Sequence, residues 1–320
     1  MKTINIQEVF STDLVTLAEA LVARGYTTFG AASNFHLSEK FGFDRGFDYF
    51  TCLPFLPADK VNEAVYAWED DIKNAEKFFL WVHYVDPHFP YTPQKPWIRE
   101  YADQAGTTKL LNQRWKSRDE LVEQVKRFHE EADAADHYLA LYDSEINYVD
   151  AHLGRLLERL NPDGNTLILI TSDHGEEFQE HGQEGHGKNL YQETVRVPLV
   201  VKLPGHLKGS IPDRHINLVD VMPTILDMVD ISPPAGMLGT SCWQEKSILL
   251  WLKGKVTGSD RDYSYSELNT KRSLKAVFAP PWKYIHDFKD GSGELYDIAA
   301  DPGETHNHAW ENTGMRDRLR

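Results

Sequence analysis

An apolar run that ends in polar residues constrains the fold of this chain more than any other segment. Residues 166–170 suit a buried parallel strand, and Asp173 and His174 follow just past its carboxyl end. Ligands and metal ions collect at that edge of open α/β sheets. The run therefore predicts an α/β fold with a polar site at the end of this strand.

The surrounding sequence alternates helical and extended patterns. Apolar spacing predicts a helix over residues 14–22, capped by Thr12 or Asp13, and a long helix over residues 138–160. Further strands are expected at 26–32, 78–82 and 197–203, and a further helix at 219–229. This alternation indicates a mainly parallel sheet covered by helices on both faces.

The composition changes after about Ile231. Short strands separated by turn residues predict a small C-terminal antiparallel sheet, with strands at 263–268, 275–278, 283–286 and 294–296. We therefore expect an α/β domain over residues 1–235 and a small α+β subdomain over residues 236–320. Charged and weakly periodic residues over 97–136 favour a surface helical insertion in the first of these domains.

Charge and cysteine content limit the classes of function. Acidic residues outnumber basic residues by 49 to 34, and the resulting net charge of -15 argues against a nucleic-acid partner. An anionic ligand must then be held by local cations or by a metal ion.

Cys52 and Cys242 provide no disulfide framework, and no apolar run approaches the roughly 20 residues of a membrane span. We expect a soluble protein, and the compartment stays open.

Histidines and glycines distinguish segment 173–188 from an ordinary acidic loop. On the turn after a strand, Asp173 and His174 can converge on one cation, although a capping aspartate beside a surface histidine gives the same dipeptide. A solvated acidic loop explains the glutamates but not three histidines and four glycines. His36 and His88 also follow predicted strands, although a packed loop histidine explains His88 equally well. Three strand ends could thus present polar groups to one pocket.

The order of motifs resembles the sulfatase family within the alkaline-phosphatase-like superfamily. The matching segments are TLAEALVARGYTT, SNFHL, GFDRGFD, FFLWVHYVDPHFPYTP, LYDSEINYVDAHLGRLL, ILITSDHGEEFQEHG, GHGKNLYQETVRVPLVV, LVDVMPTILDMV and ELYDIAADPGETHN. They occur in family order from about residue 14 to residue 307. The resemblance implies a metal-dependent hydrolase of small sulfate esters, such as aryl or carbohydrate sulfates.

The resemblance also implies a metal site. Asp173 and His174 would supply half of the ligands of one divalent ion. Calcium is typical of the family, whereas a histidine ligand is equally compatible with manganese or zinc.

Anion-binding and catalytic roles follow from the same resemblance. His36 and His88 would act at the transferred sulfate, with His88 in direct contact, and Asn34 stands in the anion pocket where the family has a lysine. A second family lysine corresponds to Lys188 or to His186, depending on the direction of counting, and both alternatives stay open.

The amino end departs from the family pattern. Family members carry an Asp-Asp pair, the other half of the metal site, followed by Cys/Ser-x-Pro-Ser/Thr-Arg, whose first residue is oxidised to the nucleophile formylglycine. No Asp-Asp pair followed by this second motif occurs in these 320 residues. The segment that starts at Cys52 matches the first three positions of the nucleophile motif. Phe55 and Leu56 replace the Ser and the Arg, however, so we reject Cys52 as the nucleophile. We expect a truncated sulfatase that is incompetent alone and has an exposed sheet edge favouring self-association.

Two other functions fit the same residues. A phosphate or phosphonate ester hydrolase would use the same metal and cations, because they stabilise either tetrahedral anion. A non-catalytic module that binds sulfated or phosphorylated carbohydrate would need the cations but no nucleophile.

Overall fold

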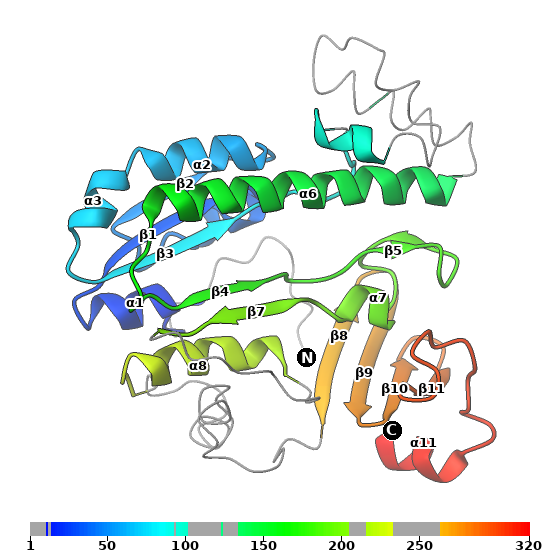
Figure 1. Ribbon diagram of the computed structural model, residues 1–320. Coiled ribbons are helices and arrows are strands. Elements are labelled where there is room, and N and C mark those ends of the chain that lie inside the picture. Colours follow the sequence, from blue (N-terminus) through cyan, green and yellow to red (C-terminus); the bar gives the residue numbers. More distant parts are fainter. Residues whose placement is uncertain are drawn as a thin grey trace. The chain divides into compact units, whose positions relative to one another are not determined.

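The computed structural model describes residues 11, 14–92, 94–101, 123, 134–204, 216–232 and 263–320. Internal contacts divide the chain into two compact units, Met1–Pro162 and Asp163–Arg320 (Figure 1). The predicted boundary after residue 235 and most of the predicted insertion over 97–136 fall outside the described residues, as does Cys242. The boundary and the insertion stay predictions.

A three-stranded parallel sheet forms the centre of the first unit (Figure 1). Its order is β2-β1-β3, and the strands are Thr27–Ala32 (β1), Tyr49–Cys52 (β2) and Phe78–His83 (β3). The α-helices are Leu17–Val22 (α1), Ala58–Tyr66 (α2), Glu69–Asn74 (α3) and Ala134–Leu160 (α6). Three short 3-10 helices are Phe35–Leu37 (η1), Glu39–Phe41 (η2) and Trp97–Glu100 (η3).

Alternation along β1 determines what each face of this sheet contacts. Phe29 and Ala31 are fully buried on one face, in a core completed by apolar side chains of α2, α3 and α6. On the other face, Gly30 lies beneath two aromatic rings, and a Cβ added there would stand 2.7 Å from the ring of Phe50 and 3.0 Å from that of Phe47. Strand β1 is therefore buried on both sides, as expected of a central parallel strand.

The first helix begins later than expected. Thr16, rather than Thr12 or Asp13, is the N-cap of α1, because its hydroxyl accepts the backbone N–H of Glu19 and the Glu19 carboxylate accepts the N–H of Thr16. This reciprocal capping box satisfies two N–H groups that the first turn leaves without partners. Thr12 and Asp13 lie outside the described residues.

Where the second unit is described, its strands form three separate sheets. Ile168–Thr171 (β4) pairs with Leu199–Lys202 (β7), and Glu177–Phe178 (β5) pairs with Glu184–Gly185 (β6). A four-stranded antiparallel sheet has the order β11-β10-β9-β8, formed by Ser264–Asn269 (β8), Ser273–Ala279 (β9), Trp282–Asp287 (β10) and Gly293–Asp297 (β11). The helices are Gln192–Val195 (α7), Leu218–Asp220 (η5, 3-10), Val221–Met228 (α8) and Thr313–Leu319 (α11).

The four-stranded sheet confirms the predicted C-terminal antiparallel sheet, and the fold class is α/β as expected. The prediction of a buried parallel strand over 166–170 is wrong, however. β4 runs antiparallel to β7, with Ile168 opposite Lys202, and its side chains are half-buried or exposed. A short apolar run suits either orientation, so its composition alone does not fix the direction of its partner.

Within the described ranges, no helix combines the length and the apolar composition that crossing a bilayer requires.

Candidate metal and anion site

Two strand ends in the first unit carry predicted site residues. β1 and β3 are parallel neighbours, so the segments that follow them leave from the same edge of the sheet. Ser33 ties these segments together: its N–H and hydroxyl donate to the His83 carbonyl at 3.1 and 3.0 Å, and its hydroxyl accepts the Val85 N–H at 2.5 Å. The chains leading to His36 and to His88 therefore start from one hydrogen-bonded junction.

Each of these histidines is anchored locally. Asn34 caps η1, and its Oδ1 accepts the N–H of His36 at 3.0 Å, while the His36 side chain is exposed. His88 is half-buried, with its Nδ1 2.5 Å from the carbonyl oxygen of Phe89. Asn34, His36 and His88 all belong to the unit Met1–Pro162.

The other predicted site residues lie in the second unit, just after β4. Asp173 Oδ1 accepts the backbone N–H of His174 at 3.0 Å, and Asp173 Oδ2 lies 3.8 Å from His174 Nε2. His174 Nδ1 lies 3.0 Å from the carbonyl oxygen of Gly175. If Nδ1 carries the proton that this contact requires, Nε2 has its lone pair free beside the Asp173 carboxylate. The two side chains thus place a carboxylate oxygen and an imidazole nitrogen 3.8 Å apart.

A glycine sets the path of this loop. The N–H of Gly175 donates to the Thr194 carbonyl at 2.9 Å, and a Cβ at residue 175 would lie only 2.1 Å from the Glu193 carbonyl oxygen. The backbone of the loop therefore approaches α7 more closely than any side chain would allow.

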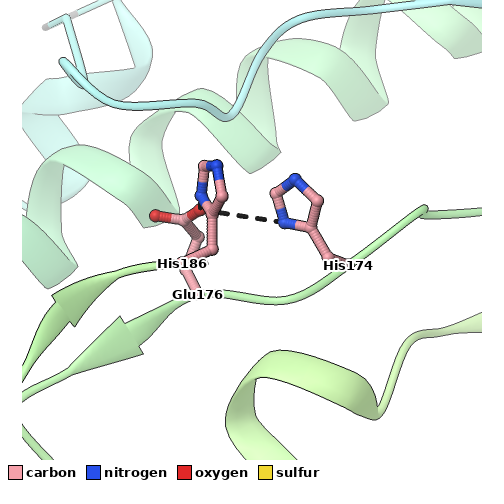
Figure 2. Close-up of side chains that lie close together, drawn as sticks. All are labelled: His174, Glu176 and His186. Atoms are coloured by element: carbon pink, nitrogen blue, oxygen red, sulfur yellow. Dashed lines mark hydrogen bonds and ion pairs between the residues drawn. The ribbon is translucent and has the colours of Figure 1, made fainter. Parts of the chain in front are cut away.

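The β5–β6 hairpin adds two residues to this corner. Glu177 faces Gly185 in the antiparallel register, so extending the register by one residue places Glu176 opposite His186. His186 Nδ1 forms a short hydrogen bond with Glu176 Oε1, and the Glu176 side chain is only 4% exposed. Figure 2 shows the side chains of His174, Glu176 and His186 pointing toward one another.

His174 and His186 are in ring contact across this corner. Their centroids are 4.0 Å apart, and His174 Nδ1 lies 3.9 Å from Glu176 Oε1. The donor atoms of His174, Glu176 and His186 all lie within 4.8 Å of one another, which is compact enough for metal ligands. The structure therefore brings together Asp173, His174 and His186, and adds Glu176, which sequence reasoning did not select.

The hydrogen bond from Glu176 is the main influence on the protonation of His186. It raises the pKa of the His186 imidazole, and burial, which opposes the charged form, offsets only part of that effect. The charge of Asp173 raises the pKa further, whereas Lys188 lowers it. Because Glu176 engages Nδ1, the remaining nitrogen of His186 is the one that can hold or donate a proton.

A pocket of about 550 Å³ opens beside His186. Its basic lining residues are Lys188 from the loop after β6 and Lys271 and Arg272 from the turn between β8 and β9. Lys188 Nζ donates to the Glu184 carbonyl at 2.7 Å, and Arg272 Nε donates to Asp287 Oδ2 at 2.9 Å. In a chain of net charge -15, these cations create a local site where an anion is favoured.

A separate cluster, formed by Glu177, His181 and Glu193, stabilises the β5–β6 hairpin. Glu177 Oε1 accepts the N–H groups of His181 and Gln183 at 2.9 and 2.8 Å. This carboxylate oxygen therefore stabilises the turn between β5 and β6. His181 Nδ1 lies 2.6 Å from Glu193 Oε1, and its ring stacks on Tyr191 at 3.7 Å. These contacts give the cluster a structural role.

Cys52 has none of the features of an activated nucleophile. Its Sγ donates to the Asn34 carbonyl at 3.3 Å, and burial raises the pKa of its thiol, as does the nearby Glu39. A raised pKa disfavours the reactive thiolate.

Comparison with known proteins identifies the family. A profile described as Sulfatase matches residues 2–231, which is more than half of the chain. The chain belongs to the sulfatase family. A second profile, N-sulphoglucosamine sulphohydrolase, C-terminal, matches residues 180–317. The two matches overlap in the segment that carries His181, His186 and Lys188.

Individual sulfatases resemble the chain over different lengths. The arylsulfatase of Clostridium perfringens (strain 13 / Type A) is 28% identical over 246 residues, covering 73% of this chain and 49% of that protein. The chain thus spans about half the length of the curated relatives it matches first.

Two solved structures share the fold. One is a protein solved in complex with its substrate D-glucosamine-2-N,6-O-disulfate, with a TM-score of 0.77 and 19% identity over 98% of this chain and 82% of that one. The other is a phosphonate monoester hydrolase from Silicibacter pomeroyi, with a TM-score of 0.75 and 17% identity over 98% and 80% of the two chains.

Proposed function

We propose that this chain supplies a metal-binding corner and an anion pocket to a hydrolase of sulfate esters. The observation that carries the proposal is the corner after β4, where His174, Glu176 and His186 meet at the edge of a cationic pocket. Membership of the sulfatase family supports the reaction class. The substrate named for one structural neighbour, a glucosamine disulfate, favours a sulfated carbohydrate over a simple aryl sulfate.

Asp173 and His174 fit the role of metal ligands. Their Oδ2 and Nε2 atoms, 3.8 Å apart, need to approach each other by less than 1 Å to bind one ion at bonds of about 2.1 Å. The Asp173 side chain is 71% exposed and free to make this adjustment. A divalent ion bound here would polarise the ester oxygens and offset the charge that develops during hydrolysis. The mixed oxygen and nitrogen donors suit manganese or zinc as well as calcium.

His186 is the residue we assign to leaving-group chemistry. The buried carboxylate of Glu176 orients its ring and holds the imidazole in the protonated state to higher pH than usual. A protonated His186 can then donate to the oxygen of the departing alcohol, or bind an anionic oxygen of the ester. Of the two alternatives left open by the sequence, His186 lies at the metal corner, and Lys188 lines the adjoining pocket.

The basic residues of the pocket would hold the substrate's anionic groups. Lys188 lines the pocket beside His186, and Lys271 and Arg272 line it from the β8–β9 turn. Arg272 keeps its charge in the ion pair with Asp287, which fixes the direction of its guanidinium group. For Asn34, His36 and His88, which belong to the first unit, the roles at the sulfate that the family pattern implies stay predictions.

A phosphonate or phosphate ester is the second candidate substrate. The phosphonate monoester hydrolase neighbour shares the fold, and a tetrahedral phosphonate would engage the same cations. Parallel assays on matched sulfate, phosphate and phosphonate esters separate the two candidates.

The test uses a protein that also carries the Asp-Asp and Cys/Ser-x-Pro-Ser/Thr-Arg segment. We expect His186→Ala to lower kcat by about a hundredfold or more, as expected for loss of a general acid. His174→Ala should raise the metal concentration needed for half-maximal activity. His286→Ala, which removes a histidine on β10 outside the corner, is the matched control. Full activity of both corner variants would overturn the proposal, and binding of sulfated sugar without turnover would favour the non-catalytic module.

A further inference from the structure

A second group of potential metal ligands lies far along the sequence from the corner, between β11 and α11. His306, His308 and Glu311 form a cluster whose donor atoms all lie within 4.8 Å of one another. The cluster is accessible, because the side chains of His306 and Glu311 are about three-fifths exposed and that of His308 about one-quarter. The activity proposed above makes no use of it.

The three donor atoms are spaced like ligands of one ion. His306 Nε2 lies 3.2 Å from both Glu311 carboxylate oxygens, and His308 Nδ1 lies 2.9 Å from Glu311 Oε2. A tetrahedral zinc ion with bonds of about 2.0–2.1 Å holds its ligand atoms about 3.3 Å apart. Small side-chain rotations therefore suffice to admit an ion between these atoms.

The backbone that carries the cluster is held in place before any ion arrives. Asp301 Oδ2 accepts the N–H groups of Thr305 and His306 at 2.7 and 2.8 Å. Asn307 Oδ1 accepts the N–H groups of Leu295 and Ala309 at 3.0 and 2.9 Å, which fastens the loop to β11. A site with a fixed backbone loses less conformational entropy when it binds an ion.

The side chain of His308 is also positioned by its neighbours. Its ring packs edge-on against Trp282 of β10, with centroids 5.7 Å apart and an interplanar angle of 86°. The His306 and His308 rings are 4.4 Å apart, and both turn their nitrogens toward Glu311. The N–H groups of Glu311 and Asn312 both donate to the His308 carbonyl, so a turn brings Glu311 back to the histidines.

We propose that His306 Nε2, His308 Nδ1 and Glu311 form a binding site for a zinc-class divalent ion. Two imidazoles and one carboxylate favour zinc, nickel or copper over calcium, which prefers an all-oxygen shell of six to eight ligands. Water occupies the remaining coordination positions, so the site is an open one. The ion holds the two ends of the segment 306–311 together ahead of α11, and this role does not depend on the proposed hydrolase activity.

Zinc uptake by the metal-free 320-residue protein tests the site. Equilibrium dialysis should show that His306→Ala/His308→Ala binds one zinc equivalent fewer than wild type, and that Glu311→Gln binds zinc more weakly. His286→Ala is the matched control, because it removes a nearby histidine of the same unit and should leave uptake unchanged. Asp173→Ala/His174→Ala should retain the C-terminal equivalent, which separates this site from the metal corner.

NMR of the imidazole nitrogens identifies the coordinating atoms. Thermal unfolding of the metal-free variants shows whether a loss of zinc binding comes from a loss of folding. Added zinc should shift the Nε2 resonance of His306 and the Nδ1 resonance of His308, with the thermal midpoint of each metal-free variant close to that of wild type. Equal zinc uptake by wild type and the double histidine variant would overturn the proposal. So would saturable binding that leaves both imidazole resonances unshifted.

Discussion

At the scale of single residues, carboxylates set the ring orientation and the pKa of two histidines of the second unit. Glu176 orients His186, and Glu193 does the same for His181. The Glu176 side chain is 4% exposed and that of Glu193 is 14% exposed, and the partner histidines lie 10 and 12 residues away in sequence. Hydrogen bonds to charged groups in such places are worth more than those on the surface.

The His181–Glu193 pair should make stability depend on pH. Burial opposes the charged form of His181, but hydrogen bonds to Glu193 and to the Glu304 carbonyl raise its pKa overall. A raised folded-state pKa stabilises the protein fully below the unfolded value near 6.5, and this stabilisation is lost as pH rises through the folded value. Glu193→Gln should therefore cost about 1.5–3 kcal/mol of unfolding free energy near pH 5.5 and less near pH 9.

Denaturant unfolding of wild type and Glu193→Gln at the two pH values measures this difference. Glu180→Gln removes a nearby exposed carboxylate and serves as the control. A loss of stability that is the same at both pH values would contradict the assignment of the pair.

At the scale of elements, close backbone approach positions the metal corner. Gly175→Ala forces a Cβ to within 2.1 Å of the Glu193 carbonyl oxygen, so the loop after β4 must move. We expect a loss of about 1–3 kcal/mol and a weaker affinity for divalent ions, because His174 shifts with the loop. Gly154→Ala is the matched control: it lies on α6 with open space around it and should stabilise by about 0.5–1 kcal/mol. Thermal unfolding and metal titration of both variants check the prediction, and unchanged affinity in Gly175→Ala would refute it.

A buried ion pair connects β10 to the loop after β11. Lys283 Nζ lies 2.8 Å from Glu304 Oε1, and the two side chains are only 3% and 0% exposed. Burial lowers the pKa of Lys283 and raises that of Glu304, so each charge depends on the other. Lys283→Met should cost about 3–5 kcal/mol because it leaves the buried Glu304 carboxylate without its countercharge and with the Gln192 N–H as a donor, whereas Lys283→Met/Glu304→Leu should cost much less. Denaturant unfolding distinguishes the two, and equal losses would count against this account.

Some secondary-structure elements could be predicted from the sequence, and others could not. The helix α6 and the strand β3 follow from long apolar patterns, and the four C-terminal strands follow from alternation between turn residues. The direction of β4 relative to β7 did not follow, because Ile168, Leu169 and Ile170 suit either orientation. Glu176 was missed because its pairing with His186 depends on the register of the β5–β6 hairpin, although its position two residues after His174 in the same loop was a usable signal.

At the scale of the whole molecule, the sulfatase assignment concerns a chain that carries some of the family's motifs but not all. An Asp-Asp pair followed by the Cys/Ser-x-Pro-Ser/Thr-Arg motif does not occur in its 320 residues. We therefore expect this chain alone to show no turnover of an aryl sulfate, even with saturating divalent metal, because its sequence lacks the motif that carries the family's nucleophile. Turnover at a rate typical of sulfatases, about 1 s⁻¹ or faster, would disprove that expectation.

Addition of Mn²⁺ to the isotopically labelled chain tests the central claim most directly, because this paramagnetic ion broadens the NMR signals of residues around its site. The account predicts that substoichiometric Mn²⁺ broadens the backbone signals of residues 172–176 and 185–187 first. It also predicts that Asp173→Ala/His174→Ala abolishes this effect while His306→Ala/His308→Ala leaves it intact. Broadening spread evenly over the acidic surface, or unchanged in Asp173→Ala/His174→Ala, would contradict the account.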